Sequence, residues 1–394
     1  MHVATSRISN LETKRRGIFH LNHFKLKLVM MKKLVKQVLG IDVAQDELVV
    51  CLRKIYDDWT TELVAHKTFS NTAKGFAELL SWVMKLTDAS IPVGYVMEAT
   101  GVYHESFAYF LHDKGLNVHI ILPNKISNYA RTLNVKTVTD KTASEAIAMF
   151  GLERKLDNWA PPKGIYRKLQ QLTRERGQLK DESTVIKNQL HAERAGAKPN
   201  KKSIERATKR LVLIAKQLRE IMTEVSELIK TDSETQAIIL LLCSIPGIGL
   251  LTAATILGET NGFELIRNKK QLTSYAGLDV REKQSGTSVK GKSSISKKGN
   301  KHLRSAMHMP ALAAIRHDEK FKAVFERLLP KHGIKMKAVV AVQRKLLEMT
   351  YTVFKTKKKY DKEYLKKEQT SKESNNGESK CDKNKMDLID IVEC

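Results

Sequence analysis

The clearest pattern in the chain is a pair of apolar, β-branched runs at residues 38–43 and 48–52, joined by four turn-forming residues. The pair predicts two neighbouring strands with a tight connection. The first run is apolar on both faces, as expected of a strand in the middle of a sheet. Asp42 interrupts this run. A buried carboxylate is costly without a partner, so Asp42 indicates either a divalent metal or a simple capping or turn role.

Strand and helix patterns alternate after these runs. Further strands are predicted at residues 61–69, 91–98 and 118–122, and helices at residues 72–86, 103–114, 124–133 and 140–152. Asn71 is the expected cap of the first helix. The alternation predicts an α/β domain. Its sheet is expected to be mixed, because the first three strands follow one another as a meander.

The pattern becomes helical after Pro161-Pro162. Apolar residues recur at spacings of three and four through residues 165–190 and 204–229, on either side of a break at residues 195–200. This predicts a coiled-coil hairpin, with two helices packed on a globular core as the alternative. The next apolar segment, to about Thr352, predicts a compact, mainly α-helical domain.

These patterns divide the chain into five parts. They are a basic N-terminal extension (1–31), the α/β domain (32–160), the coiled-coil hairpin (161–232), the helical domain (233–355) and a polar C-terminal tail (356–394). The extension and the tail after about Lys366 lack apolar periodicity, so both are expected to be disordered.

The net charge of the chain indicates the kind of partner that it binds. The 394 residues carry 69 Lys and Arg against 43 Asp and Glu, a net charge of +26. This excess favours a nucleic acid as partner over a membrane surface or mere solubility. No apolar run reaches membrane-spanning length. The four scattered cysteines indicate neither a zinc site nor a disulfide framework, which fits a cytoplasmic protein.

Three acidic residues fall at the ends of predicted elements: Asp42 on the first strand, Glu98 at the end of the fourth, and Asp140 at a helix start. Parallel neighbouring strands would bring Asp42 and Glu98 to one sheet edge, and the helix start would add Asp140. Such a cluster is favourable if cations hold it together, and hard oxygen ligands suit Mg²⁺. Taken singly, Glu98 could pair with a lysine and Asp140 could be a helix N-cap.

Two later segments predict contact with nucleic-acid backbone. Pro246, Gly247 and Gly249 form a turn between helices that is typical of a helix-hairpin-helix element, whose backbone N–H groups approach phosphate; an ordinary helical turn is the alternative. Residues 281–301 are rich in Ser, Gly and Lys. This composition predicts a flexible loop, and its positive charge predicts that the loop contacts nucleic-acid phosphates. The basic residues expected to contact nucleic acid there are Lys290, Lys292, Lys297, Lys298 and Lys301.

Together these motifs resemble the DEDD transposases of bridge-RNA-guided insertion sequences, over about residues 38–345. Gly40-Ile41-Asp42, Met97-Glu98-Ala99-Thr100-Gly101 and Thr139-Asp140-Lys141 are similar to the three acidic motifs of the family's RuvC-like (RNase H-like) domain. The hairpin stands where the family inserts a coiled coil. Residues 245–249, 275–278 and 296–300 are similar to the family's transposase domain.

The resemblance implies a mechanism. Ser285 matches the family's nucleophilic serine, which would attack a DNA phosphodiester with the help of Mg²⁺ on Asp42, Glu98 and Asp140. It also implies donor and target DNA selected by a structured guide RNA, and a homo-oligomer, either a dimer or a tetramer. One position departs from the family: its fourth carboxylate, three residues after the third, is Ala143 here. Glu145 replaces it only if the first helical turn is irregular.

Two other functions are consistent with the sequence. A RuvC-like nuclease or junction resolvase would use water as the nucleophile and would not need Ser285. A nucleic-acid-binding descendant with impaired catalysis would account for Ala143.

Overall fold

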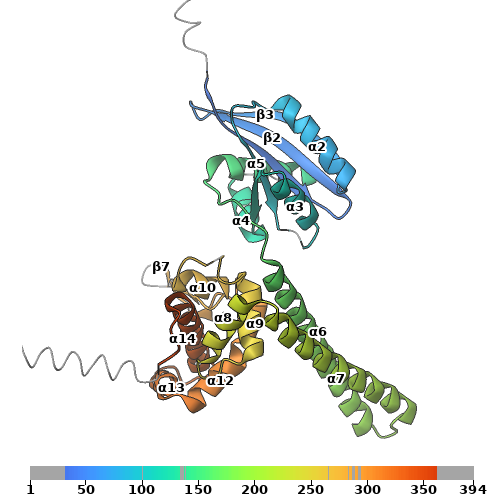
Figure 1. The fold of residues 1–394 in the computed structure, drawn as a ribbon, viewed down its shortest axis with the longest axis vertical. Helices are drawn as coiled ribbons and strands as arrows, with labels where there is room; N and C mark the ends of the chain where they lie inside the picture. The colour runs from blue at the N-terminus through green and yellow to red at the C-terminus, as the bar shows by residue number, and fades with distance from the viewer. Residues whose placement is uncertain are drawn as a thin grey trace, which may run out of the picture. The chain divides into compact units, whose positions relative to one another are not determined.

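The computed structural model describes residues 32–361, apart from residues 100, 134–136, 138, 265, 283, 286–288 and 292–293. The expected N-terminal extension and the tail after residue 361 lie outside the described residues. The chain divides into two compact units, Met1–Pro161 (unit 1) and Pro162–Cys394 (unit 2), which are considered separately (Figure 1).

Unit 1 is built on a five-stranded sheet with the strand order β3-β2-β1-β4-β5. The strands are β1 (Leu34–Val43), β2 (Glu47–Tyr56), β3 (Thr61–Ser70), β4 (Val93–Glu98) and β5 (Asn117–Ile121). β1, β2 and β3 form an antiparallel meander, whereas β1 pairs in parallel with β4, and β4 with β5. The prediction of a mixed α/β sheet is therefore confirmed.

Helices cover both faces of this sheet. They are α2 (Ala73–Leu86), α3 (Glu105–Asp113), α4 (Pro123–Ala130), the short 3-10 helix η1 (Arg131–Leu133) and α5 (Asp140–Glu153). Side chains alternate between faces along a strand, so the odd and even residues of β1 meet different helices. Leu39 and Ile41 pack with α2 and α3. Val38 packs with α4 and α5 on the other face.

The start of α2 differs from the prediction. The side chain of Thr72 accepts a hydrogen bond from the backbone N–H of Gly75 and caps the helix. The prediction of Asn71 as the cap is wrong, because the Asn71 amide instead donates to two loop carbonyls.

Unit 2 is mainly helical. Its helices are α6 (Gly164–Ala195), α7 (Lys201–Lys230), α8 (Ser233–Cys243), α9 (Leu250–Thr260), α10 (Lys269–Tyr275), α11 (Lys301–Ala306), α12 (His308–His317), α13 (Glu319–His332) and α14 (Lys335–Thr356). Residues 253–260 of α9 are all buried, so α9 is the central helix of the unit. Four two-residue strands interrupt the helices: β6 (Val280–Arg281), β7 (Gln284–Ser285), β8 (Val289–Lys290) and β9 (Ser294–Ile295).

Helices α6 and α7 form a long antiparallel hairpin that projects from the other helices of unit 2 (Figure 1). Near its base, Leu169 and Val225 join the main core of the unit. Farther out, Ile186, Leu190, Ala207 and Ile214 form a separate buried cluster. The apolar spacing in the sequence thus corresponds to residues buried along the hairpin. No helix in the described part of the chain is both long and apolar enough to cross a membrane.

Candidate active site

The structure of unit 1 brings the three predicted carboxylates to one face of the sheet. β1 and β4 run in parallel with Ile41 opposite Met97, so the next residues, Asp42 and Glu98, are neighbours at the carboxyl ends of the two strands. Asp42 follows Val38 at an even interval, so it lies on the face covered by α5. Asp140 is the first residue of α5. The three acids therefore lie around the start of α5, on one face of the sheet.

Two glycines let α5 lie directly on this face. A Cβ atom at Gly40 would stand 2.3 Å from the backbone nitrogen of Ala148 and 2.3 Å from the carbonyl oxygen of Ser144. A Cβ atom at Gly151 would stand 2.8 Å from side-chain carbons of Val38 and Val96. Such distances are too short for any side chain, so the close approach of helix and sheet depends on glycine. This packing sets how near Asp140 comes to Asp42.

The carboxylates repel one another. Burial, together with the charge of Asp140, raises the pKa of Asp42 above its ordinary value, although the backbone N–H of Val43 partly opposes the shift. Burial and the charge of Asp42 likewise raise the pKa of Glu98. No ion pair joins a described lysine or arginine to Asp42 or Glu98. The two acids thus lack a protein counter-charge within the described chain, which disfavours the lysine-paired interpretation of Glu98.

The N-cap interpretation of Asp140 is wrong. Thr139 caps α5: its hydroxyl accepts from the N–H of Thr142, and the Thr142 hydroxyl accepts from the N–H of Thr139. This capping box makes the first turn regular. Asp140 is consequently free of a capping role, and its carboxylate stands in the first turn, where the helix dipole favours negative charge.

Glu145 points to another part of the same face. Its Oε1 lies 2.8 Å from Nε2 of His66, on β3. β3 is on the opposite side of β1 from β4, the strand that carries Glu98. The irregular first turn that would redirect Glu145 is absent from α5, because the N–H of Ala143 bonds regularly to the carbonyl of Thr139. The structure therefore gives no support to Glu145 as the fourth carboxylate.

The carboxylates of unit 1 are chemically suitable ligands for a divalent cation, but their side chains are not arranged around a single metal position. Among the described residues, no three His, Cys, Asp or Glu side chains converge closely enough to hold a metal ion. However, Asp42, Glu98 and Asp140 offer oxygen ligands, and their mutual repulsion is what a bound cation would relieve. The donor set fits a hard cation once the side chains close on it.

The turn at residues 244–249 lies between α8 and α9, as predicted. Gly247 has φ +86°, and a Cβ atom there would stand 2.3 Å from the carbonyl oxygen of Pro310. Gly247 therefore serves the packing of the turn on α12. Gly249, the exposed N-cap residue of α9, has no described atom within 4 Å of where its Cβ would be. Pro246 is partly exposed.

Ser285 lies on a short arm of unit 2 that is made of two successive two-stranded ladders. β6 pairs with β9 at the base of the arm, and β7 pairs with β8 farther out, with Ser285 opposite Val289. The backbone of Lys290 belongs to β8, and Lys292 lies outside the described residues. The remaining predicted contact residues, Lys297, Lys298 and Lys301, are exposed where the chain passes from the arm into α11. The carboxylates and Ser285 thus belong to different units.

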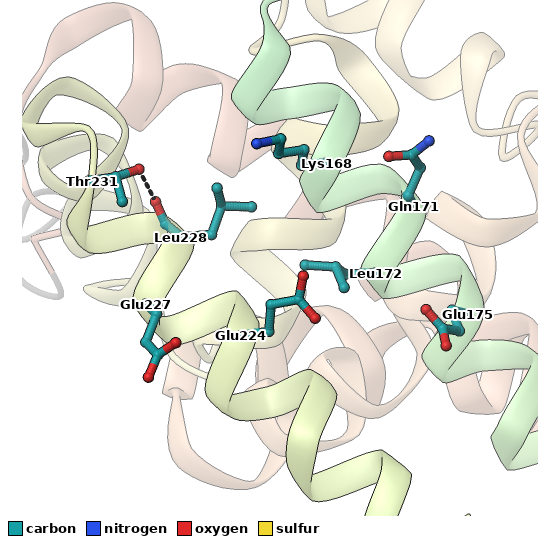
Figure 2. A pocket seen from close by; sticks show the side chains of 8 residues that line it. All are labelled: Lys168, Gln171, Leu172, Glu175, Glu224, Glu227, Leu228 and Thr231. Carbon is teal, nitrogen blue, oxygen red and sulfur yellow. Dashed lines mark hydrogen bonds between the residues drawn. The ribbon is translucent and has the colours of Figure 1, made fainter.

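A pocket of about 550 Å³ lies between the bases of α6 and α7, and Figure 2 shows its lining. Lys168, Gln171, Leu172 and Glu175 come from α6, and Glu224, Glu227, Leu228 and Thr231 follow on or just after α7. Most of these side chains are charged or polar groups of the helix surface. The pocket has neither the strand-end carboxylates nor a glycine-rich close approach, so the candidate active site is the acidic cluster of unit 1.

Comparison with known proteins identifies the family. Residues 39–193 match a transposase model of the DEDD type, and residues 240–326 match the model described as Transposase IS116/IS110/IS902 family. Together the matched segments cover more than half of the chain and include both the acidic cluster and the arm with Ser285. The chain belongs to the IS116/IS110/IS902 family of transposases. It is thereby placed among the DNA transposases and site-specific recombinases.

Sequence similarity to two relatives of this transposase covers most of the chain. The pilin gene-inverting proteins of Moraxella bovis and Moraxella lacunata are each 29% identical over 329 residues, covering 83% of this chain and 98% of the relative. An uncharacterized 43.6 kDa protein of insertion element IS110 from Streptomyces coelicolor is 26% identical over 145 residues, covering 37% of this chain and 35% of the relative. Among solved structures, T. thermophilus RuvC in complex with a Holliday junction matches with a TM-score of 0.23 and 11% identity, over 29% of this chain and 90% of RuvC.

Proposed function

We propose that this transposase is an RNA-guided DNA recombinase that cuts and rejoins DNA strands through Ser285. The observation that supports the proposal is the placement of Asp42, Glu98 and Asp140 around the start of α5, where Asp42 and Glu98 have no described counter-charge. Asp42 and Glu98 are half-buried, and neighbouring like charges with little access to water are costly, so this arrangement favours a cation-dependent reaction. The Moraxella relatives are named for inverting a pilin gene, which is a rearrangement of DNA.

Unit 1 supplies the acidic half of the reaction. Asp42, Glu98 and Asp140 would hold one or two Mg²⁺ ions. Bound there, the ions would supply charge stabilisation for a phosphoryl group in transfer. The sheet order and the parallel β1–β4 pair are consistent with a RuvC-like domain.

Unit 2 supplies the nucleophile. The hydroxyl oxygen of Ser285 attacks phosphorus, and the new oxygen–phosphorus bond forms as the bond to one sugar oxygen breaks. The serine proton passes to water, and the leaving sugar oxygen takes up a proton. The energy of the phosphodiester is conserved in the serine ester, so the reverse step can join a different strand.

Nucleic acid is held by the basic surfaces of unit 2. We infer that the turn at Gly249 acts as a helix-hairpin-helix contact, because its backbone is open where the α9 N-terminus favours a phosphate. Lys297, Lys298 and Lys301 add positive charge where the arm joins α11. The α6–α7 hairpin acts as a coiled coil for a homo-oligomer, and base pairing in a structured guide RNA selects the target and donor DNA.

The decisive experiment traps the serine ester. Purified protein that carries its co-purified RNA is incubated with Mg²⁺ and a DNA suicide substrate whose broken strand cannot religate. We expect a covalent protein–DNA adduct, and peptide mapping should place it on Ser285. Ser285→Ala should abolish both adduct and cleavage while RNA and DNA binding persist.

Ser294→Ala is the matched control, because Ser294 lies on the same arm, in β9. It should retain most activity, as should substitutions of Ser288 and Ser293. Full cleavage by Ser285→Ala would instead establish a water-using nuclease of the RuvC type. Binding without cleavage by the wild-type protein, under conditions where a family member is active, would point to an impaired descendant.

A further inference from the structure

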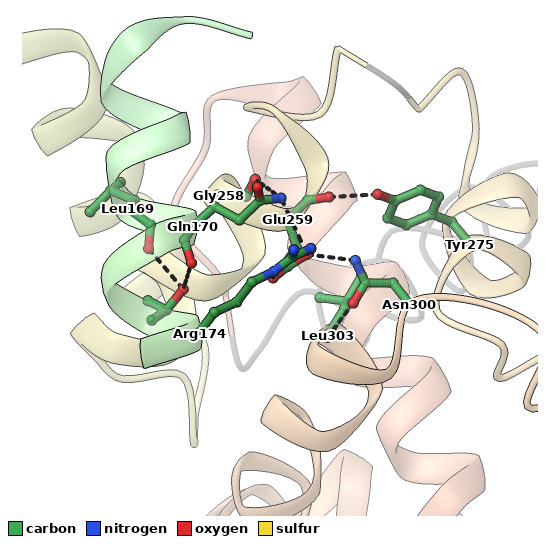
Figure 3. A network of polar contacts seen from close by, with 9 residues as sticks. Leu169, Gln170, Arg174, Gly258, Glu259, Tyr275, Asn300 and Leu303 are labelled. Atoms are coloured by element: carbon green, nitrogen blue, oxygen red, sulfur yellow. Dashed lines mark hydrogen bonds and ion pairs between the residues drawn. The ribbon is translucent and has the colours of Figure 1, made fainter. Parts of the chain in front are cut away.

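Glu259 of α9 is a charged side chain in the middle of unit 2, with 1% of its surface exposed. Figure 3 shows its surroundings. Arg174 of α6 donates two hydrogen bonds to it, from Nε to Oε1 at 2.7 Å and from Nη2 to Oε2 at 2.8 Å. The side-chain amide of Asn300 donates to Oε2 at 2.6 Å. The carboxylate is therefore bound from α6 on one side and from the residue that precedes α11 on the other.

The charged form of Glu259 is favoured by these contacts. Burial alone would raise the pKa of Glu259, but the hydrogen bonds and charge of Arg174 and the bond from Asn300 outweigh burial and hold the pKa below its ordinary value. Gly258 brings α9 close to α6, since a Cβ atom there would stand 2.8 Å from the backbone nitrogen of Gln170. The contact between α6 and Glu259 is thus built into the backbone packing.

Asn300 connects this carboxylate to the root of the arm that carries Ser285. Its backbone N–H donates to the carbonyl of Tyr275 at 2.7 Å, and its Oδ1 accepts from the N–H of Leu303 at 2.9 Å and caps α11. The Tyr275 hydroxyl in turn donates to the main-chain carbonyl of Glu259 at 2.8 Å. Both sides of the root are therefore tied to residue 259.

Close backbone packing completes the root. The N–H of Lys297 donates to the carbonyl of Gly277 at 3.1 Å. A Cβ atom at Gly299 would stand 2.4 Å from the carbonyl oxygen of Tyr275. The two ends of the arm, at Gly277 and Lys297, are thus held together, and Tyr275 and Asn300 are among the residues that attach them to the helices.

We propose that Arg174, Glu259 and Asn300 are positioning residues that fix the direction of the Ser285 arm relative to the α6–α7 hairpin. The proposal rests on the proposed serine mechanism. The residues bind no substrate themselves. They hold the arm root by a buried, fully paired charge, which resists the small displacements that loosen a nucleophile from its attack position. A misplacement of about 1 Å can cost on the order of a hundredfold in rate.

The test uses Asn300→Asp in the full-length protein with its RNA. This change keeps the oxygen that caps α11 but places a second carboxylate against Glu259. In single-turnover adduct formation at saturating DNA, we expect the rate constant to fall about a hundredfold, while the dissociation constants for RNA and DNA stay within about twofold. A loss of folded protein would lower the amplitude of the reaction, whereas misplacement of the arm lowers its rate constant.

Three further variants complete the design. Asn300→Ser keeps a capping oxygen without adding charge and should also be slow. The double variant Glu259→Gln with Asn300→Asp exchanges carboxylate and amide, and should recover much of the rate constant. Asn268→Asp is the matched control, because Asn268 is an exposed N-cap of α10 that bonds the N–H of Gln271, and it should react at the wild-type rate.

The outcomes separate this inference from the proposed function. If wild-type protein forms its adduct on Ser285 but Asn300→Asp and Asn300→Ser keep the wild-type rate constant, the positioning role is refuted and the serine mechanism stands. If wild-type protein cleaves DNA without a serine adduct, the serine mechanism fails and the positioning role fails with it.

Discussion

Asp42 in unit 1 is a half-buried carboxylate and Glu259 in unit 2 is a buried one, and their surroundings are opposite. Glu259 accepts hydrogen bonds from Arg174, Asn300 and Gln170, and its pKa is lowered. Asp42 faces other carboxylates, and its pKa is raised. A carboxylate whose partners are already present within the unit has no capacity left for a ligand. One that is crowded by like charges has a strong electrostatic demand for a cation.

This contrast distinguishes a paired structural carboxylate from a candidate metal-binding carboxylate better than burial does. Ranked by burial alone, Glu259 would be the leading candidate for a catalytic acid, since it is the more enclosed side chain. The direction of the pKa shift and its cause reverse that ranking. Strongly shifted groups occur in both kinds of site, so the partner has to be identified before a function is assigned.

The largest expected effect comes from removing one acid of the cluster. Asp42→Asn or Glu98→Gln should lower the rate of strand cleavage about a thousandfold, because charge stabilisation by a bound ion is worth several kcal/mol and each 1.36 kcal/mol is tenfold. RNA binding should remain within about twofold, since the basic surfaces of unit 2 are unchanged. Cleavage assays and RNA titrations on the same preparations measure both. Loss of both cleavage and RNA binding in a folded variant would contradict the assignment of cation binding to unit 1 and RNA binding to unit 2.

The second effect tests the packing that places Asp140 beside Asp42. Gly40→Ala introduces a Cβ atom 2.3 Å from backbone atoms of α5. We expect the free energy of unfolding to fall by about 3 kcal/mol, at the upper end of overpacking costs, and cleavage to fall with it. Denaturant unfolding and cleavage rates below the transition measure the two losses.

Gly177→Ala is the control for this substitution. Gly177 lies within α6, and no described atom is within 4 Å of where its Cβ would be. Alanine there should leave stability unchanged or raise it by up to about 1 kcal/mol, because alanine favours the helix. Equal effects of the two substitutions would show that the approach of α5 to β1 is not tight.

The surroundings of Asp42 could largely be predicted from the sequence, whereas those of Glu259 could not. The strand patterns were sufficient for the acidic cluster, because parallel strands place their carboxyl ends together and the spacing of Asp42 within its run is local information. Arg174 and Asn300 stand 85 and 41 residues from Glu259. Arg174 resembles an ordinary polar residue of a helix surface and Asn300 one of a loop until tertiary packing brings them together. The signal that could have drawn attention to Glu259 is that it is the one charged residue of α9.

For Glu145, the sequence indicated the direction of the side chain but not its partner. Sequence spacing indicated that a residue five positions after Asp140 points away from it, but the partner on the facing strand, His66, follows only from the sheet order. The side-chain position of Ser285 remains a prediction, because the described structure gives only the backbone of its strand.

The third effect is an opposite response of the two sites to pH in metal-free buffer. The raised pKa values of Asp42 and Glu98 mean that their contribution to stability is present below the ordinary values, 3.8 and 4.5, and is lost as the pH rises through the raised values. The lowered pKa of Glu259 means that its contribution is present above 4.5 and is lost as the pH falls through the lowered value.

Hydrogen exchange of peptides from β1 and α9 can follow each site separately between about pH 3 and 8. Relative to wild type, Asp42→Asn should gain protection in β1 as the pH rises. Glu259→Gln should lose protection in α9 at neutral pH and lose less in acid. Added Mg²⁺ should cancel the gain of Asp42→Asn, because the ion stabilises the wild-type acids alone. A parallel pH response of both variants would remove the distinction between the two carboxylates.

The smallest expected effect comes from adding an acid to the cluster. Ala143 lies one helical turn after Asp140 and is partly exposed, so Ala143→Asp would place a carboxylate on the same face of α5. Its effect on stability should be slight: aspartate is a weaker helix former than alanine by about 0.6 kcal/mol, and the helix N-terminus returns about 0.3–1 kcal/mol. Mg²⁺-dependent cleavage should stay level or rise up to about tenfold, because a fourth oxygen ligand would strengthen cation binding. Cleavage rates over a Mg²⁺ titration measure this, and the Mg²⁺ concentration at half-maximal rate should fall.

Glu145→Ala, measured beside it, should retain most activity, because Glu145 is engaged with His66. Inactive Glu145→Ala together with impaired Ala143→Asp would place the fourth carboxylate at Glu145, and would require α5 to unwind at its first turn when the cation binds.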